Sequence, residues 1–174
     1  TPKSKQQEAY DLLLDKTNQL AERFPDSTET LFWQAVILSA RAEQQDGFTA
    51  LNAVHKSRDL LEEAIKKNPQ TANGSAYVTL ATLYYMVPKW PIAFGDTEKA
   101  EQLFTTALKI NPQGIDTNYF YGDFLLSHKH SNEAQKYFEK ALSAPTRQEQ
   151  EFADTKLKEE VKLALDSTKF RKIK

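Results

Sequence analysis

The sequence contains no cysteine, a single methionine, five glycines and almost no net charge. The lack of cysteine excludes disulfides, thiol nucleophiles and thiolate metal sites, and leaves the cellular compartment open. The 23 basic and 24 acidic side chains give a formal net charge of −1. Because such a chain has no strong field to attract phosphate backbones, nucleic acid is not an expected partner.

Long apolar runs are missing as well. The longest, residues 31–40 and 77–87, are far shorter than the roughly 20 residues that a membrane-spanning helix needs. We therefore expect no helix that spans a bilayer. The sequence begins with Thr1 instead of methionine, from which we expect a missing upstream segment, either cloned away or removed as a signal peptide or lipoprotein leader.

What the sequence does contain is one phrase written three times. It reads LLEEAIKKNP at 60–69, LFTTALKINP at 103–112 and YFEKALSAP at 137–145. In each copy, two large apolar residues are followed one helical turn later by alanine and an aliphatic residue, and a proline then ends the helix. The alanines are Ala64, Ala107 and Ala141, spaced by 43 and 34 positions. The second spacing matches the tetratricopeptide repeat (TPR) period of about 34 residues.

This repetition predicts an all-α fold, a right-handed solenoid of antiparallel, TPR-like helix pairs with about eight helices. At this length, residues 1–174 are expected to form a single domain. Its expected parts are an N-terminal helix at 4–24, helix-pair repeats at 27–69, 73–112 and 115–145, and a C-terminal capping helix at 146–166.

Capping residues predict where three helices begin. Asn73 or Ser75 is expected to open the helix that precedes residue 87, and Asp96 the helix that follows it. Thr146 and Glu149 have the spacing of a capping box for the last helix. That helix is expected to face the array with an apolar stripe made of Phe152, Leu157, Val161, Leu163, Ala164 and Leu165.

The third repeat predicts the tightest packing. Gly122 and Ala134 are small residues on its two helices and would let the helices approach closely, with Phe138 between them.

Residues 87–96 interrupt the repeat. Their sequence, VPKWPIAFGD, holds two prolines, one glycine and two large aromatic residues, so it cannot continue a helix and predicts an ordered apolar loop. Trp90 and Phe94 either pack against the helices on both sides of the loop or present an edge for binding. The sequence leaves both interpretations open.

The first helix of each pair turns one side toward the concave face of a TPR solenoid, where such proteins hold partners. Here that face is expected to carry Phe32, Val36, Val78, Thr82, Tyr85, Tyr119, Asp123 and Leu126. Peptide-binding TPR grooves commonly carry Lys, Arg and Asn, whereas this set is mostly aromatic and aliphatic. Either a terminal helix covers the face, with Phe152 or Leu157 filling it, or an apolar pocket is left open for a hydrophobic ligand or partner segment.

Catalytic and metal sites are not indicated. His128 and His130 lie two residues apart at a helix end, a spacing that points their side chains away from each other, and nothing completes a tetrahedral ligand set. His55 lies among polar neighbours without a flanking nucleophile, and the glycines form no phosphate-binding loop. We therefore expect no catalytic residue, no cofactor and no metal, and a protein that is not an enzyme.

Three stretches resemble a known family. They are LYYMVPKWPIAFGDTEKA at 83–100, INPQGID at 110–116 and NYFYGDF at 118–124. They are similar to the TatT-component family, TPR proteins associated with tripartite ATP-independent periplasmic (TRAP) transporters, with good agreement over 75–145 and looser agreement before residue 70. The resemblance implies an exported, periplasmic, often lipid-anchored protein. It also implies a periplasmic substrate-binding protein as partner and passage of a hydrophobic small molecule through an apolar channel.

The expected function is a non-enzymatic TPR scaffold that binds a protein partner, an apolar ligand or both through its concave face and the loop of Trp90 and Phe94. The alternative is a general TPR adaptor whose groove is occupied by its own terminal helix. A cytoplasmic location and self-association remain open.

Overall fold

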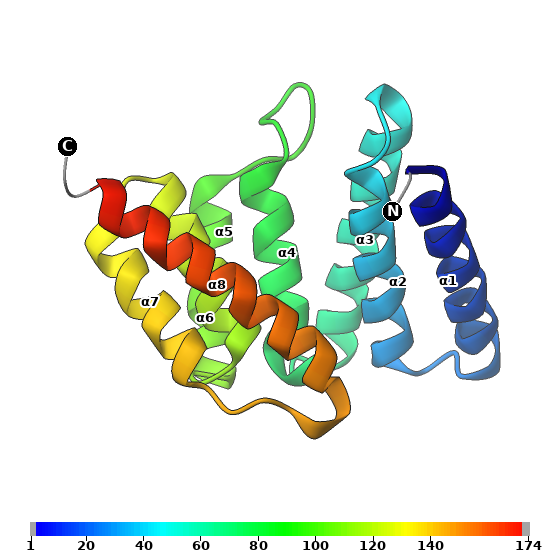
Figure 1. Ribbon diagram of the computed structural model, residues 1–174. Helices are drawn as coiled ribbons and strands as arrows, with labels where there is room; N and C mark the ends of the chain where they lie inside the picture. The colour runs from blue at the N-terminus through cyan, green and yellow to red at the C-terminus, as the bar shows by residue number, and fades with distance from the viewer. Residues whose placement is uncertain (1–2, 172–174) are drawn as a thin grey trace.

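The computed structural model describes residues 3–171, with side chains from 5 to 168, and this part of the chain is helical without strands (Figure 1). Its eight α-helices confirm the predicted fold class, a helical-repeat solenoid. None of the helices in this range is long and apolar enough to cross a membrane. The helices are α1 Lys3–Arg23, α2 Thr28–Ala42, α3 Gly47–Lys67, α4 Ser75–Met86, α5 Thr97–Ile110, α6 Ile115–Ser127, α7 Ser131–Ser143 and α8 Glu151–Arg171.

The helices pack as neighbouring pairs. Helix α2 lies against α3, α4 against α5, and α6 against α7, while α1 packs on α2 at one end (Figure 1). Helix α8 lies across the other end, where it contacts both α7 and α6. Helices α2, α4 and α6 thus contribute the faces that the sequence predicts to be concave.

The repeated phrase forms the centre of each pair. Ala64, Ala107 and Ala141 have no exposed surface and belong to the main hydrophobic core. Phe104 and Phe138 are fully buried beside them. Each ring removes enough apolar area from water to stabilise the fold by about 1.5–3 kcal/mol.

The predicted close packing at Gly122 is confirmed. A Cβ atom on Gly122 would lie 2.7 Å from the Phe138 ring and 3.3 Å from the carbonyl oxygen of Ala134. No room exists for even a methyl group at this position, so the α6–α7 pair depends on glycine.

The starts of the helices match the sequence only in part. The Asp96 side chain accepts a hydrogen bond from the Lys99 amide at 3.0 Å and caps α5 as predicted. At α4 the Asn73 alternative is wrong, because Ala72 and Asn73 have left-handed backbones with φ of 50° and 52°. The Ser75 alternative matches the first helical residue, although the N-cap is Gly74, with φ of 89°. This reversal of the chain needs a glycine at its last position.

The capping box predicted for the last helix is also wrong. Gln148–Gln150 forms a 3₁₀ turn, and α8 begins only at Glu151 and extends to Arg171, beyond the predicted end at 166. The Arg147 amide and guanidinium donate to the Asp154 carboxylate, at 2.7 Å from the amide and 2.6 Å from Nη2. This buried carboxylate replaces the Thr146–Glu149 pair because it satisfies more donors at once.

The inner face of α8 differs from the predicted stripe. Val161 has no exposed surface and Asp154 is 1% exposed, whereas Phe152 and Leu163 are 79% and 72% exposed. Leu157, Ala164 and Leu165 are partly buried. Helix α8 therefore turns Asp154 and Val161 inward and leaves Phe152 and Leu163 facing solvent.

Candidate functional site

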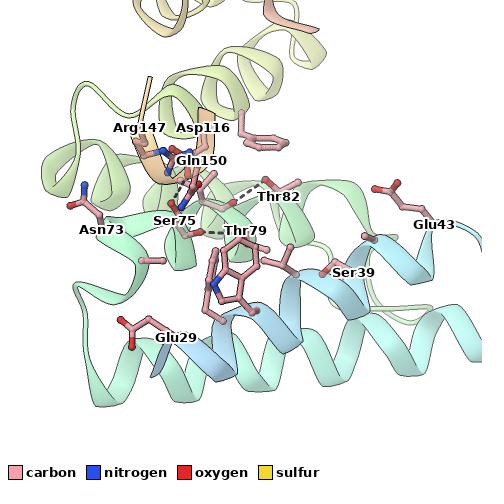
Figure 2. Close-up of a pocket in the computed structure, with 17 residues that line it drawn as sticks. Glu29, Ser39, Glu43, Asn73, Ser75, Thr79, Thr82, Asp116, Arg147 and Gln150 are labelled. Carbon is pink, nitrogen blue, oxygen red and sulfur yellow. Dashed lines mark hydrogen bonds between the residues drawn. The ribbon is translucent and has the colours of Figure 1, made fainter. Parts of the chain in front are cut away.

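A cavity of about 590 Å³ lies on the concave side between α2 and α4 (Figure 2). The start of α6 and the segment 147–150 before α8 close one of its ends. We call it the main cavity. Its size falls within the range of small-molecule and side-chain binding sites.

Four of the predicted concave-face residues come together here. Phe32, Val36, Val78 and Thr82 all line the main cavity. Phe32 and Val78 are 6% and 2% exposed and form part of its apolar wall.

Two aromatic residues of the main cavity were missed. Trp33 is 46% exposed, and its ring meets that of Phe32 edge-on at 5.2 Å between centroids. Phe120 lines the wall from α6. The sequence signal for Trp33 was present, since α2 is apolar on nearly every side. No sequence signal pointed to Phe120, because the helical spacing assigned its neighbour Tyr119 to the concave face.

The other predicted concave residues do not line this cavity. The Tyr85 hydroxyl donates to Asp123, and the Tyr85 ring packs edge-on against Phe124 at 5.6 Å between centroids. Burial raises the pKa of Tyr85, and the hydrogen bond and negative charge of Asp123 add to the effect. Leu126 is 8% exposed. These side chains therefore belong to the packed part of the array.

Helix α8 covers the part of the concave face formed by α6. It packs directly on α6, and its Val161 joins the main hydrophobic core. Burial raises the pKa of Tyr119 to about 12, with further contributions from the carboxylates of Glu160 on α8 and of Asp123. Each of the two alternatives drawn from the sequence thus describes one half of the face: α8 covers the half near Tyr119, and the half near Phe32 is open. Val161 is fully buried on this side of α8, whereas Phe152 is exposed and Leu157 only partly buried.

One end of the main cavity is polar. The Ser75 hydroxyl donates to Oδ2 of Asp116, while Oδ1 of Asp116 is enclosed and accepts no hydrogen bond. Arg147 lies nearby, but its guanidinium is bonded to Asp154, with Nε 3.1 Å from Oδ2. Figure 2 shows Asp116, Ser75, Arg147 and Gln150 gathered at this end.

The pKa of Asp154 reflects this pairing. Desolvation of its carboxyl favours the protonated form, but the side-chain and backbone hydrogen bonds from Arg147 outweigh it and hold the pKa of Asp154 below its usual range. The pair fixes the segment that closes the main cavity.

A second, smaller cavity continues the groove toward the loop. It measures about 280 Å³ and shares Ser39, Glu43, Thr79 and Thr82 with the main cavity. Apolar side chains of α3 and of the end of α4 complete its walls, among them Leu51, Val54, Leu83 and Met86. The open half of the concave face is therefore one apolar groove that ends beside residue 87.

The loop at 87–96 closes on itself and packs on the helices through Phe94. The Gly95 amide donates to the Pro88 carbonyl at 2.9 Å, and a Cβ on Gly95 would clash with the Val87 carbonyl oxygen. Phe94 packs edge-on against His55 and Tyr84, at 5.0 and 5.3 Å between centroids.

The interpretation that both aromatic residues of the loop pack on the helices is wrong for Trp90, which is 85% exposed. Phe94 does pack, but against α3 and α4 instead of α4 and α5: the Arg58 guanidinium lies 4.7 Å from its ring centre. Trp90 precedes a cis peptide bond to Pro91 and stands beside the exposed Ile92. The loop projects beyond the end of α4 (Figure 1).

The histidines at the end of α6 contact local partners. Nδ1 of His128 lies 2.8 Å from the Phe124 carbonyl oxygen, and Nδ1 of His130 lies 3.8 Å from Glu133. Among the residues that the structure describes, no group of three or more histidines and carboxylates could hold a metal ion.

Comparison with known proteins supports a TPR architecture. Residues 92–154, from within the loop to the first turn of α8, match the tetratricopeptide repeat family. The fold is similar to the crystal structure of a thermophilic TPR protein from Thermus thermophilus, with a TM-score of 0.67 and 18% identity over 87% of this chain and 71% of that chain. At this identity the likeness shows the fold alone. No curated protein matches the sequence. The chain is thus a helical-repeat protein with the fold of a TPR array and a tetratricopeptide-repeat sequence at 92–154.

Proposed function

We propose that this protein is a non-enzymatic scaffold that binds an apolar segment of a partner protein in the open half of its concave face. The observation that carries the proposal is the main cavity of about 590 Å³, walled by Phe32, Val36 and Val78. Solenoids bind partners along this face. An apolar hollow that no part of the described chain fills is the kind of surface that a partner covers.

The loop supplies a second contact for the same segment. The second cavity leads from the main cavity to Met86, which is 61% exposed, and beyond it lie Trp90 and Ile92. Large apolar side chains that project into solvent, tryptophan above all, are typical anchors of protein interfaces. A segment in the groove would run from Phe32 toward Trp90.

A test uses a random peptide library selected on the immobilised protein. Peptides that are recovered should bind the variant Val36→Arg at least about tenfold more weakly, because the new side chain fills the cavity and brings a charge into it. Thr105→Arg, at an exposed position of α5, is the control and should bind as the wild type does. Recovery of no peptide, or equal binding to both variants, would contradict the proposal.

The alternative is a general adaptor whose groove is occupied by its own terminal helix. The cover that α8 places over Tyr119 supports it, and a partner would then contact the outer surface. In that case recovered peptides would lose affinity for variants on the outer helices α5 and α7, and Val36→Arg would have no effect.

The sequence of 83–100 supports a narrower proposal: a periplasmic protein that associates with a TRAP-type transporter, partners its substrate-binding protein and passes an apolar ligand along the groove. Two measurements test it. A substrate-binding protein of a TRAP system from the same organism should bind the wild type and bind Trp90→Ala more weakly. Native mass spectrometry should reveal a retained apolar molecule, which Val36→Arg should not carry. The absence of both effects would contradict this narrower function.

A further inference from the structure

We propose that the polar end of the main cavity receives a basic side chain, arginine or lysine, from the bound partner segment, with the Asp116 carboxylate as its acceptor. This inference rests on the proposed function and adds the chemistry that the groove recognises. The lining of this cavity carries carboxylates, which favour a cationic ligand, whereas the lining of peptide-binding TPR grooves commonly carries basic residues.

Asp116 is the first reason. It is 9% exposed at the cavity wall, and Ser75 donates to only one of its two carboxylate oxygens. The other oxygen is enclosed and accepts nothing. An ionised carboxylate has capacity for several donors, and leaving part of it unpaired inside a protein is costly. Asp116 lines the main cavity, so a donor that enters beside Ser75 and displaces the atoms around the enclosed oxygen would supply the missing partner.

The arginine already at this end is not that donor. Arg147 lies close enough for its charge to interact with Asp116, but its Nε, Nη2 and backbone amide all donate to Asp154. No ion pair joins Arg147 to Asp116 in the described part of the chain. The positive charge of Arg147 is thus paired with Asp154, and the negative charge of Asp116 forms no ion pair with it.

Most of the other charged residues in the lining have the same sign. Glu29 and Glu43 lie along the main cavity, and Arg147 is the one basic residue among its described lining residues (Figure 2). A cleft in which one sign of charge predominates and whose walls have a low dielectric constant attracts groups of the opposite charge. A cationic group is therefore drawn toward Asp116, and a carboxylate is repelled.

The walls suit the stem of such a side chain. Phe32, Trp33 and Phe120 line the same cavity, so the aliphatic part of an arginine or lysine can lie against aromatic rings. A guanidinium or ammonium group within about 6 Å of a ring centre gains cation–π attraction as well. Together, an apolar wall and a buried acceptor at its end match a long basic side chain better than a purely apolar one.

The probes are pools of acetylated, amidated pentapeptides with random apolar residues around one fixed central residue: arginine, its uncharged isostere citrulline, or glutamate. Fluorescence anisotropy measures how each pool binds to the full protein. The arginine pool should bind at least about tenfold more tightly than the citrulline pool, because a bond to a charged group is the stronger kind. The glutamate pool should bind most weakly.

The variant Asp116→Asn keeps an acceptor for Ser75 and removes the charge. It should abolish the preference for arginine over citrulline and leave citrulline binding nearly unchanged. Glu98→Gln, on the exposed side of α5 outside the main cavity, is the matched control and should keep the preference. If Asp116→Asn does not fold, Glu29→Gln/Glu43→Gln changes two exposed positions and should reduce the preference for arginine.

Three outcomes would overturn the inference. Equal binding of the arginine and citrulline pools in the wild type would remove the role of charge. A preference that persists in Asp116→Asn would place the acceptor elsewhere. Binding of 4-phenylbutylammonium as tight as that of the arginine pool would point to a small amine as the ligand. If apolar peptides bind in a Val36-dependent way without any preference for arginine, the proposed function stands and this inference fails.

Discussion

At the scale of single residues, small side chains and one buried carboxylate decide how the array packs. Alanine favours helices more than glycine does, yet Gly122 lies in the middle of α6. The Phe138 ring on α7 occupies the space that a methyl group would need. The geometry of the pair therefore outweighs the local preference of the helix.

Gly122→Ala should destabilise the protein by about 1–3 kcal/mol, because the overpacking cost exceeds the gain of up to about 1 kcal/mol in helix propensity. Urea unfolding followed by circular dichroism measures the change. The double variant Gly122→Ala/Phe138→Leu tests the cause: the smaller side chain at 138 should cancel part of the penalty of the alanine. Strictly additive losses would show that the clash is not with this ring.

Asp154→Asn should reduce the free energy of unfolding at pH 7 by about 1.5–3 kcal/mol, the range for hydrogen bonds to a charged group. The value should lie toward the lower end, because Arg147 is partly solvated.

The loss should depend on pH. The folded pKa of Asp154 is lowered, so its stabilisation is present above the unfolded value of about 3.9 and disappears as the pH falls through the folded value. The difference between wild type and Asp154→Asn should therefore shrink below about pH 4. Asp59→Asn breaks a pair with Arg58 in which Asp59 is exposed, and should cost less than about 1 kcal/mol. A penalty for Asp154→Asn that stays constant down to pH 2 would contradict the assignment.

At the scale of elements, the loop at 87–96 and helix α8 shape the groove from its two ends. The loop is tied to α3 and α4 through Phe94, and α8 is tied to the array through Val161 and Asp154. Both elements carry a second large apolar residue that faces solvent. Substituting the packed residue and the exposed residue of each element in turn therefore distinguishes the loss of packing from the loss of an exposed side chain.

Phe94→Ala should cost about 1–3 kcal/mol, less than for a fully buried ring because Phe94 is only half-buried. It should also raise amide hydrogen exchange in the loop, because the ring is its contact with α3. Trp90→Ala removes an exposed side chain and should change stability by less than about 0.5 kcal/mol. Equal effects of the two substitutions would show that the loop is not anchored at Phe94.

Val161→Asp should release α8, because it places a charge at a position with no exposed surface. Hydrogen exchange along α8 should rise, and an apolar dye should bind to the uncovered face of α6. Leu163→Asp changes a residue that is 72% exposed and should leave both readouts at the wild-type level. If Leu163→Asp had the larger effect, the inner face of α8 would be misassigned.

The sequence predicted those features that depend on local patterns. The repeated alanines, the proline stops, the Asp96 cap and the Gly122 contact all follow from residues close together in the chain or at fixed repeat positions. The start of α8 did not, because the bond between Arg147 and the buried Asp154 overrides the Thr146–Glu149 signal. The opposite positions of Trp90 and Phe94 also depend on contacts with α3 that no local pattern encodes.

At the scale of the whole molecule, the concave face is divided. Helix α8 returns over α6 and buries the half near Tyr119, while α2 and α4 leave the half near Phe32 open. The candidate residues on this face therefore separate into two groups. Phe32, Val36 and Val78 form the groove, whereas Tyr85, Tyr119, Asp123 and Leu126 hold the array together.

One measurement tests this division directly: nuclear magnetic resonance spectra of the ¹⁵N-labelled protein during titration with a peptide recovered by selection. Binding in the groove predicts shifts of the Ser39, Thr79 and Asp116 amides, with those of residues 123–126 unchanged. Shifts confined to the outer helices α5 and α7, or spread over α6 and α8 with Thr79 unaffected, would contradict the assignment of the open half as the binding site.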